Sequence, residues 1–190
     1  MSSRKRLLFP LWLIAAMIAL GGLVSGCGYH MRADGVPVGI EIGSLAIPLV
    51  ESTSSTMGFE ADFTRVLRQE FISHAQVSIV PEERAQTVLS GTIYEIATDA
   101  LSYETQGETI GGNYTTYSVT SSRRLKIKLD MRLTERATEK VIWRDRNMEE
   151  RASFSLGDDP LETRYRQQKA LEAMARDLAK RIYLKTMERF

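Results

Sequence analysis

The stretch RLKIKLDMRLT, Arg124 to Thr134, alternates strictly between apolar and polar side chains. Its apolar positions are Leu125, Ile127, Leu129, Met131 and Leu133. Successive side chains of a β-strand point to opposite faces, so this pattern predicts a strand with one buried face and one solvated face. We therefore expect a sheet that is covered on one side, and other parts of the chain must supply the cover.

Two segments that flank this strand are predicted to lie beside it. Thr87 to Tyr103 reads as a longer strand, and Val141 to Ser155 returns the chain after a turn at Glu135 to Lys140 that contains no glycine. In the first segment the alternation places Leu89 and Ile93 on one face of the strand, and Val88, Tyr94 and Ile96 on the other face. These strands would run antiparallel, because each follows the previous one after a local reversal of the chain.

The segment Ser102 to Ser122 is rich in Ser, Thr, Tyr and Gly and connects two of the predicted strands. We interpret it as the end of a long hairpin that turns around Gly111-Gly112. If the hairpin pairs fully, Tyr117 to Thr134 would span ~60 Å at ~3.3 Å per residue, against ~17–20 Å for a typical strand. Such strands would project beyond the helices that cover them, and the projecting part is available to a partner.

Two segments with helical spacing can cover the sheet. The first has apolar residues at Phe59, Phe63, Val66, Leu67 and Phe71, and the second at Leu171, Met174, Ala175, Leu178 and Ile182. The second helix is predicted to begin at Asp158-Asp159-Pro160, and short strands are predicted near Leu45–Leu49 and Val77–Ile79. This order predicts an α+β fold: a two-layer sandwich of a mainly antiparallel four- to five-stranded sheet with two helices on one face.

The front of the chain has the features of a lipoprotein signal peptide. A basic cluster at Arg4 to Arg6 precedes the uncharged run Leu7 to Leu20, and small residues lead to Cys27, the single cysteine of the chain. The end of this region, Val-Ser-Gly-Cys, resembles a bacterial lipobox, so we expect cleavage of residues 1–26 and attachment of acyl chains such as palmitate at Cys27. The alternatives are an uncleaved signal anchor and an ordinary cysteine in a cleaved leader. Gly rather than Asp at position 28 indicates export to the outer membrane of a Gram-negative bacterium.

Length and charge limit the remaining possibilities. Residues 1–26 hold three of the 25 basic residues, so the mature chain would carry 22 basic and 24 acidic residues. This slight acidic surplus argues against a general nucleic-acid binder. We expect a lipid-anchored segment over 27–40 and a single α+β domain over 41–190.

The sequence lacks the residue patterns of an enzyme or a metal site. Its two histidines, His30 and His74, and one cysteine cannot assemble an ordinary zinc site. No Gly-x-Ser-x-Gly elbow and no phosphate-binding loop is present, and Ser90 has no evident His and Asp to activate it. We therefore expect no enzymatic activity, no metal and no cofactor.

The polar side of the strand predicted over Arg124 to Thr134 is the best candidate for a binding surface. Arg124, Lys126, Lys128 and Arg132 lie on it, with Arg123 beside them and Asp130 interrupting the row. One interpretation is the solvated side of a half-covered sheet. The other is recognition of anionic groups such as the phosphates of a lipid head group, which Arg and Lys bind well.

Five short stretches, in this order along the chain, resemble the LptE family of lipopolysaccharide-assembly lipoproteins. They are Cys27–Arg32 (CGYHMR), Ser44–Pro48 (SLAIP), the amphipathic segment Gly58–Phe71, Ala85–Ile93 (AQTVLSGTI) and Val141–Trp143 (VIW). The resemblance implies the same sandwich fold and a one-to-one complex in which the protein plugs the lumen of the outer-membrane β-barrel LptD. It also implies assistance to lipopolysaccharide on its way to the cell surface.

On this resemblance we expect a lipid-anchored outer-membrane protein that faces the periplasm and lies inside the barrel lumen. The hypothesis for the lipopolysaccharide-binding residues comes from the charge pattern and names Arg123, Arg124, Lys126 and Lys128. Two other functions stay open at this point. One is an auxiliary lipid-binding lipoprotein of another envelope transport system, and the other is an envelope hydrolase.

Overall fold

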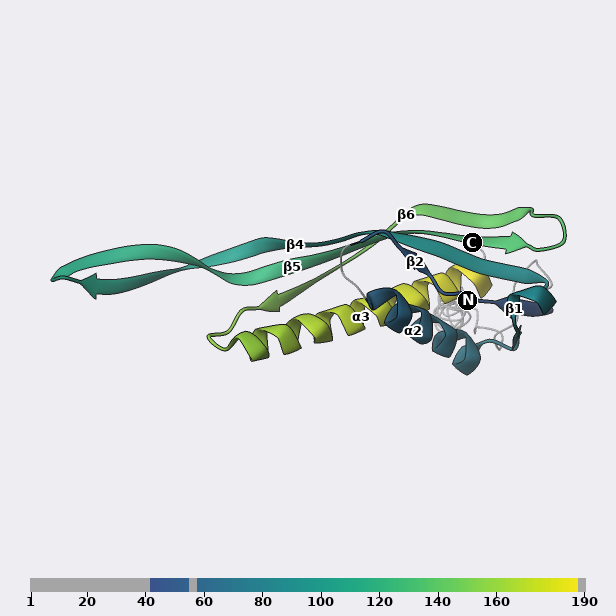
Figure 1. Cartoon of the computed structure of the whole chain (residues 1–190), viewed down its shortest axis with the longest axis horizontal. Coiled ribbons are helices and arrows are strands. Elements are labelled where there is room, and N and C mark those ends of the chain that lie inside the picture. The colour runs from purple at the N-terminus through teal and green to yellow at the C-terminus, as the bar shows by residue number, and fades with distance from the viewer. Residues whose placement is uncertain (1–41, 55–57, 188–190) are drawn as a thin grey trace, which may run out of the picture. The chain divides into compact units, whose positions relative to one another are not determined.

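The computed structural model describes residues 42–54 and 58–187 (Figure 1), and all of these belong to one compact unit. The predicted signal peptide, Cys27 and the predicted anchored segment 27–40 lie outside the described residues. Within the described ranges, no helix combines the length and the apolar character needed to cross a membrane.

The described chain forms a mixed sheet and two helices. The elements are β1 (Ser44–Ala46), β2 (Glu51–Ser52), α2 (Phe59–His74), β3 (Ser78–Ile79), a 3-10 turn η1 (Glu82–Arg84), β4 (Thr87–Ile110), β5 (Asn113–Glu135), β6 (Val141–Ser155) and α3 (Pro160–Met187). The sheet order is β3-β1-β4-β5-β6, and β2 also pairs with β4. The short strands β1, β2 and β3 pair in parallel, whereas the long strands β4, β5 and β6 are antiparallel.

Both helices lie on one side of the sheet, as Figure 1 shows. The predicted α+β fold class is therefore confirmed. The sheet has six strands rather than four to five, because the two-residue strand β2 adds to β4 after Pro48. The last helix begins where predicted, at Pro160, and the Asp159 side chain accepts a hydrogen bond from the backbone N–H of Leu161 at 2.8 Å.

The core lies between the helices and the apolar face of β5. All five apolar residues of the alternating stretch, Leu125, Ile127, Leu129, Met131 and Leu133, are completely buried. Side chains from both helices complete the core: Phe63, Leu67, Phe71, Met174, Leu178 and Ile182. Full burial of each such side chain stabilises the fold by ~1.5–3 kcal/mol. The hydroxyl of Tyr183 in α3 also donates to the carbonyl oxygen of His74 at 2.9 Å, which ties α3 to the end of α2.

A β-bulge at Tyr94 reverses the alternation of β4. Ile93 is opposite Leu129, but Glu95 is opposite Lys128, so Tyr94 is an extra residue in the ladder. After the bulge, Ile96 is opposite the buried Ile127 and packs against the core. The predicted placement of Ile96 on the face opposite to Leu89 and Ile93 is therefore wrong, because a strict period of two does not survive an inserted residue.

Strands β4 and β5 pair along their whole lengths, from Thr87 opposite Glu135 to Ile110 opposite Asn113. With 24 residues, β4 spans about 80 Å at ~3.3 Å per residue. The turn is Gly111-Gly112, with φ of 59° and 86°, the left-handed values that a two-residue hairpin turn requires. This confirms the predicted long hairpin.

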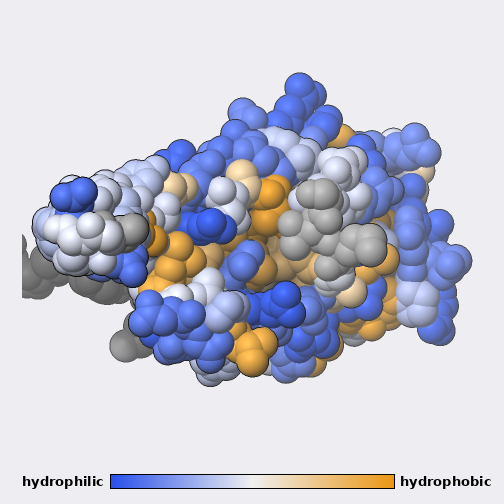
Figure 2. Space-filling view, turned by 60° about the vertical axis from the view of Figure 1, so that its left-hand side comes forward, coloured by the Kyte–Doolittle hydropathy of each residue, from blue (hydrophilic) through white to orange (hydrophobic). Residues whose placement is uncertain are grey.

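The pairing of β6 with β5 ends where Ser155 lies opposite Ser122. In the described part of the chain, no third strand pairs with residues 102–121, which we call the projecting half of the hairpin. The remaining residues of β4 and β5, 87–101 and 122–135, form its covered half. Figure 2 looks toward the projecting half, whose surface is mostly pale, whereas orange apolar side chains gather nearer the helices.

Candidate anion-binding face of the sheet

The face of the sheet that points away from α2 and α3, here called the outer face, carries the polar residues of β5. On β5 these are Arg124, Lys126, Lys128, Asp130 and Arg132, each beside a buried core residue. Directly opposite them on β6 lie Arg144, Glu149 and Arg151, and on β4 lie Glu95 and Asp99. Side chains that are directly opposite in an antiparallel pair share a face, so acids and bases from three strands meet here.

Glu95 lies between two of the predicted site residues. The Nζ of Lys126 is 2.5 Å from Glu95 Oε1, and the Nζ of Lys128 is 2.9 Å from Glu95 Oε2. Hydrogen bonds from Lys126 and then Lys128 lower the pKa of Glu95, and the hydrogen bond to Glu95 raises the pKa of Lys128. Both shifts favour the charged forms of Glu95 and Lys128, and the three side chains of the cluster are 23–32% exposed.

The two predicted arginines lie on different faces of β5. Arg124 is exposed on the outer face, opposite Asp99 of β4 and Ser153 of β6. Arg123 is opposite the buried Phe154 and two residues from the buried Leu125, so it belongs to the helix-bearing side. The structure thus brings Arg124, Lys126 and Lys128 together on one face and places Arg123 on the other.

Two further ion pairs occupy the outer face. Arg144 Nε donates to both carboxylate oxygens of Asp130, at 3.0 and 3.2 Å, and this contact lowers the pKa of Asp130. Arg151 pairs with Glu149 on the same strand. Glu95, Glu149 and Arg151 were not predicted to be neighbours of the lysines. The antiparallel return of β6 was predictable, but the residue opposite each lysine was not.

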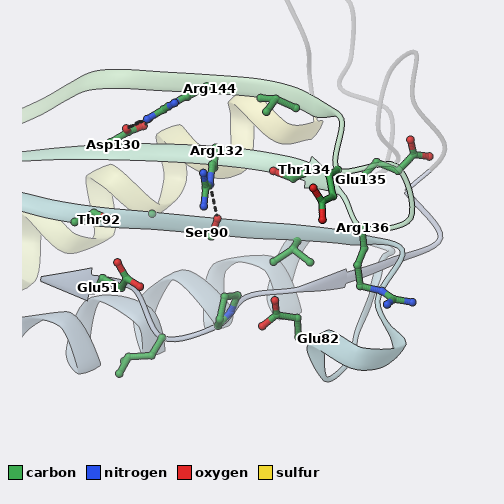
Figure 3. Close-up of a pocket in the computed structure, with 16 residues that line it drawn as sticks. Glu51, Glu82, Ser90, Thr92, Asp130, Arg132, Thr134, Glu135, Arg136 and Arg144 are labelled. Carbon is green, nitrogen blue, oxygen red and sulfur yellow. Dashed lines mark hydrogen bonds and ion pairs between the residues drawn. The ribbon is translucent and has the colours of Figure 1, made fainter.

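A hollow of about 640 Å³ lies at one end of the outer face, beside the turn between β5 and β6 (Figure 3). Arg132 Nε donates to Ser90 Oγ at 3.1 Å, and Asp130 and Arg144 point toward one another at its edge. Acidic residues are numerous in its lining: Glu51, Glu82, Asp130, Glu135 and Glu139. This end is therefore less suited to an anion than the stretch that holds Arg124, Lys126 and Lys128.

Comparison with known proteins identifies a family model that covers most of the described residues. The model "LptE: Lipopolysaccharide-assembly" matches residues 42–186. No curated protein matches the chain.

Several solved structures are similar to the chain. The solution structure of uncharacterized lipoprotein B from Nitrosomonas europaea has a TM-score of 0.52 at 13% identity, with 84% of this chain and 90% of that one covered, so the two share a fold. Rare lipoprotein B from Shewanella oneidensis has a TM-score of 0.43 at 18% identity, with 75% and 93% covered. A minor lipoprotein from Acinetobacter baumannii has a TM-score of 0.44 at 15% identity, with 78% and 93% covered.

Proposed function

The chain belongs to the LptE family of lipopolysaccharide-assembly proteins, and we propose that it is an outer-membrane lipoprotein that plugs and stabilises a lipopolysaccharide-exporting β-barrel. In this role it forms a one-to-one complex with a barrel of LptD type and assists the passage of lipopolysaccharide to the cell surface. The observation that carries this proposal is the family match over residues 42–186, which includes both helices and all six strands almost completely.

The hairpin supports a position inside a larger protein. Its strands are about 80 Å long at ~3.3 Å per residue, well beyond the ~30 Å hydrocarbon core of a bilayer. The projecting half presents unpaired strand edges and the exposed rings of Tyr103 and Tyr114. Such edges are usually protected in isolated proteins, and the wall of a barrel lumen would protect them here.

The anchoring part of the proposal depends on Cys27. The basic cluster, the apolar run and the small residues before this cysteine are the features of a lipoprotein signal. Acyl chains contribute ~0.8 kcal/mol per buried methylene, so several chains hold a protein at a membrane almost irreversibly. Metabolic labelling with a palmitate analogue should mark the natural chain and leave the Cys27→Ser variant unmarked.

For lipopolysaccharide we propose contact through the basic residues of β5. Arg124, Lys126 and Lys128 supply adjacent cations on the outer face, and Arg123 supplies one on the helix-bearing side of the sheet. Charged hydrogen bonds from Arg and Lys are well suited to phosphate groups. Charge reversal at Arg124 and Lys126 should weaken lipopolysaccharide binding, and unchanged binding of the double variant would contradict this assignment.

The test of the main proposal is extraction of the lipidated protein from its own membranes in mild detergent, followed by mass spectrometry of what accompanies it. A β-barrel partner in a one-to-one ratio is the expected result. Recovery of the protein alone, or with inner-membrane transporter subunits, would contradict the plug role. It would favour an auxiliary lipid-binding lipoprotein instead.

A further inference from the structure

We propose that Glu95 is an internal counter-anion of the outer face, which occupies Lys126 and Lys128 in the free protein and is displaced when a phosphate group binds them. This inference rests on the proposed contact between the outer face and the phosphates of lipopolysaccharide. It assigns to Glu95 the role of setting the affinity and specificity of that contact.

The conformation of the β4 backbone places Glu95 on the outer face, beside Lys126 and Lys128. Leu89 and Ile93 point into the core, and by simple alternation residue 95 would follow them. The bulge at Tyr94 turns Glu95 to the outer face instead, directly opposite Lys128. Bulges commonly re-aim a side chain in this way. The position of the carboxylate is thus a consequence of an irregularity in the strand, and an unbroken ladder would not produce it.

The contacts of Glu95 match what a phosphate would make. Each of its two oxygens takes one lysine, at 2.5 and 2.9 Å. Lys126 and Lys128 are two residues apart on one face of β5, about 7 Å along the strand, so a single bridging anion can reach both. A phosphate monoester has three acceptor oxygens and a charge of about −1.5 to −2 at neutral pH. It can therefore satisfy both ammonium groups with more charge than the carboxylate brings.

The exchange is physically accessible. All three side chains are partly exposed, with 23% of Lys126, 30% of Lys128 and 32% of Glu95 open to solvent. Ion pairs of this kind are weak, because water competes for both partners. The low pKa of Glu95 keeps it ionised at neutral pH, so displacement by a stronger anion, rather than protonation, releases the lysines.

The surrounding charges nearly cancel, so the charge of the Glu95 carboxylate has a large effect on the net charge around the two lysines. Around the lysines the outer face has the bases Arg124, Lys126, Lys128 and Arg151 and the acids Glu95, Asp99 and Glu149. The surplus is one positive charge, and neutralising Glu95 would double it. Among the described ion pairs of this face, Glu95 is the acid that contacts two bases at once.

The experiment compares lipopolysaccharide binding by the full lipidated protein, purified in mild detergent, with binding by its Glu95→Gln variant. Gln keeps the size of the side chain and its ability to accept a hydrogen bond but removes the charge. We expect affinity to rise about threefold to tenfold at low salt and the gain to shrink as salt screens the lysines. The gain should vanish when dephosphorylated lipopolysaccharide is used as the probe.

Glu172→Gln is the matched control. Glu172 lies on α3 and pairs with Lys169 at 2.9 Å, so its substitution changes the net charge equally without touching the outer face. A Glu95→Ala variant, checked for unchanged thermal unfolding, should reproduce the gain and so exclude an effect of the new amide.

Two outcomes separate this inference from the function on which it rests. If Glu95→Gln and Glu95→Ala leave binding unchanged or weaken it, while Lys126→Glu abolishes it, the outer face binds lipopolysaccharide but Glu95 is not a competing anion. If neither the Glu95 variants nor Lys126→Glu and Lys128→Glu alter binding, the proposed contact with the outer face is itself wrong. An equal gain in Glu172→Gln would also overturn the inference, since net charge alone would then explain it.

Discussion

The covered and projecting halves of the β4–β5 hairpin share the same two strands and one continuous ladder, yet they are held in different ways. In the covered half, β6 extends the sheet and two helices bury one face, so that Leu129 and Leu133 are inaccessible to solvent. In the projecting half, no described side chain is buried, and Tyr103 and Tyr114 are 65% and 72% exposed. Its two charged residues are Glu104 and Glu108.

The difference shows that strand pairing and burial are separate contributions. A two-stranded hairpin is marginally stable by itself in water, because pairing buries little apolar surface. The projecting half is held by continuity with the covered half, by the glycine turn and by local contacts such as that of Tyr114 with Gly107. We therefore infer that the covered half determines whether the domain folds, and that the projecting half is an interaction surface.

The largest expected difference between the halves concerns apolar truncation. Leu129→Ala removes a completely buried side chain and should lower the free energy of unfolding by ~2–5 kcal/mol. Val119→Ala changes a residue of the projecting half that is 36% exposed, and should change the free energy by less than ~0.5 kcal/mol. Urea unfolding measures both. Similar losses in the two variants would show that the projecting half carries its own core.

Two glycines offer a second comparison of the halves. A Cβ at Gly91 would lie 2.1 Å from the buried Met131 sulfur and 2.7 Å from the Asp130 carbonyl oxygen, so Gly91→Ala should cost ~1–3 kcal/mol through overpacking. A Cβ at Gly107 would lie 2.0 Å from the hydroxyl of Tyr114, but this exposed ring can swing away. Gly107→Ala should therefore cost less than ~1 kcal/mol. Thermal unfolding of the pair checks the order, and a larger loss at Gly107 would reverse it.

Most of the covered half was predictable from residue types, because burial of one face of a strand or helix produces a regular spacing of apolar residues in the sequence. The strict alternation of 124–134 and the helical spacing from Phe59 to Phe71 correspond to β5 and α2, and β6 has the predicted bounds. The bulge at Tyr94 was not predictable, since an inserted residue has no compositional signature. It concealed both the core position of Ile96 and the outer-face position of Glu95.

The candidate site was predicted less completely, because it depends on which residues lie opposite one another. Arg124, Lys126 and Lys128 were found from a single strand, but their acidic neighbours come from β4 and β6, and both strands contain register shifts. One shift leaves Arg146 and Asn147 without a one-to-one partner on β5. Alternation along one strand could not reveal that the lysines share Glu95.

The two turns of the sheet provide a smaller test. In the projecting half the left-handed positions are filled by Gly111 and Gly112, whereas the turn between β5 and β6 places Glu139 at φ 57°. The left-handed conformation costs a non-glycine residue ~1–2 kcal/mol, and glycine at this position avoids that cost. Glycine also gives the unfolded chain more conformational freedom, which offsets part of the stabilisation. Glu139→Gly should therefore raise the free energy of unfolding by ~0.5–1 kcal/mol. Gly112→Glu should lower it, and urea unfolding of both variants checks the signs.

The smallest effect on stability should come from shortening the projecting half. Deleting residues 104–108 together with 115–119 removes five facing pairs and keeps the Gly111-Gly112 turn and its register. Because these residues bury no side chain, the free energy of unfolding should change by less than ~0.5 kcal/mol. Recovery of the barrel partner in the detergent extraction should nevertheless fall sharply, since the proposed contact surface is gone. A shortened protein that unfolds as before and still binds the barrel normally would assign the interface to the covered half. One that no longer folds would mean that the two halves are not energetically separate.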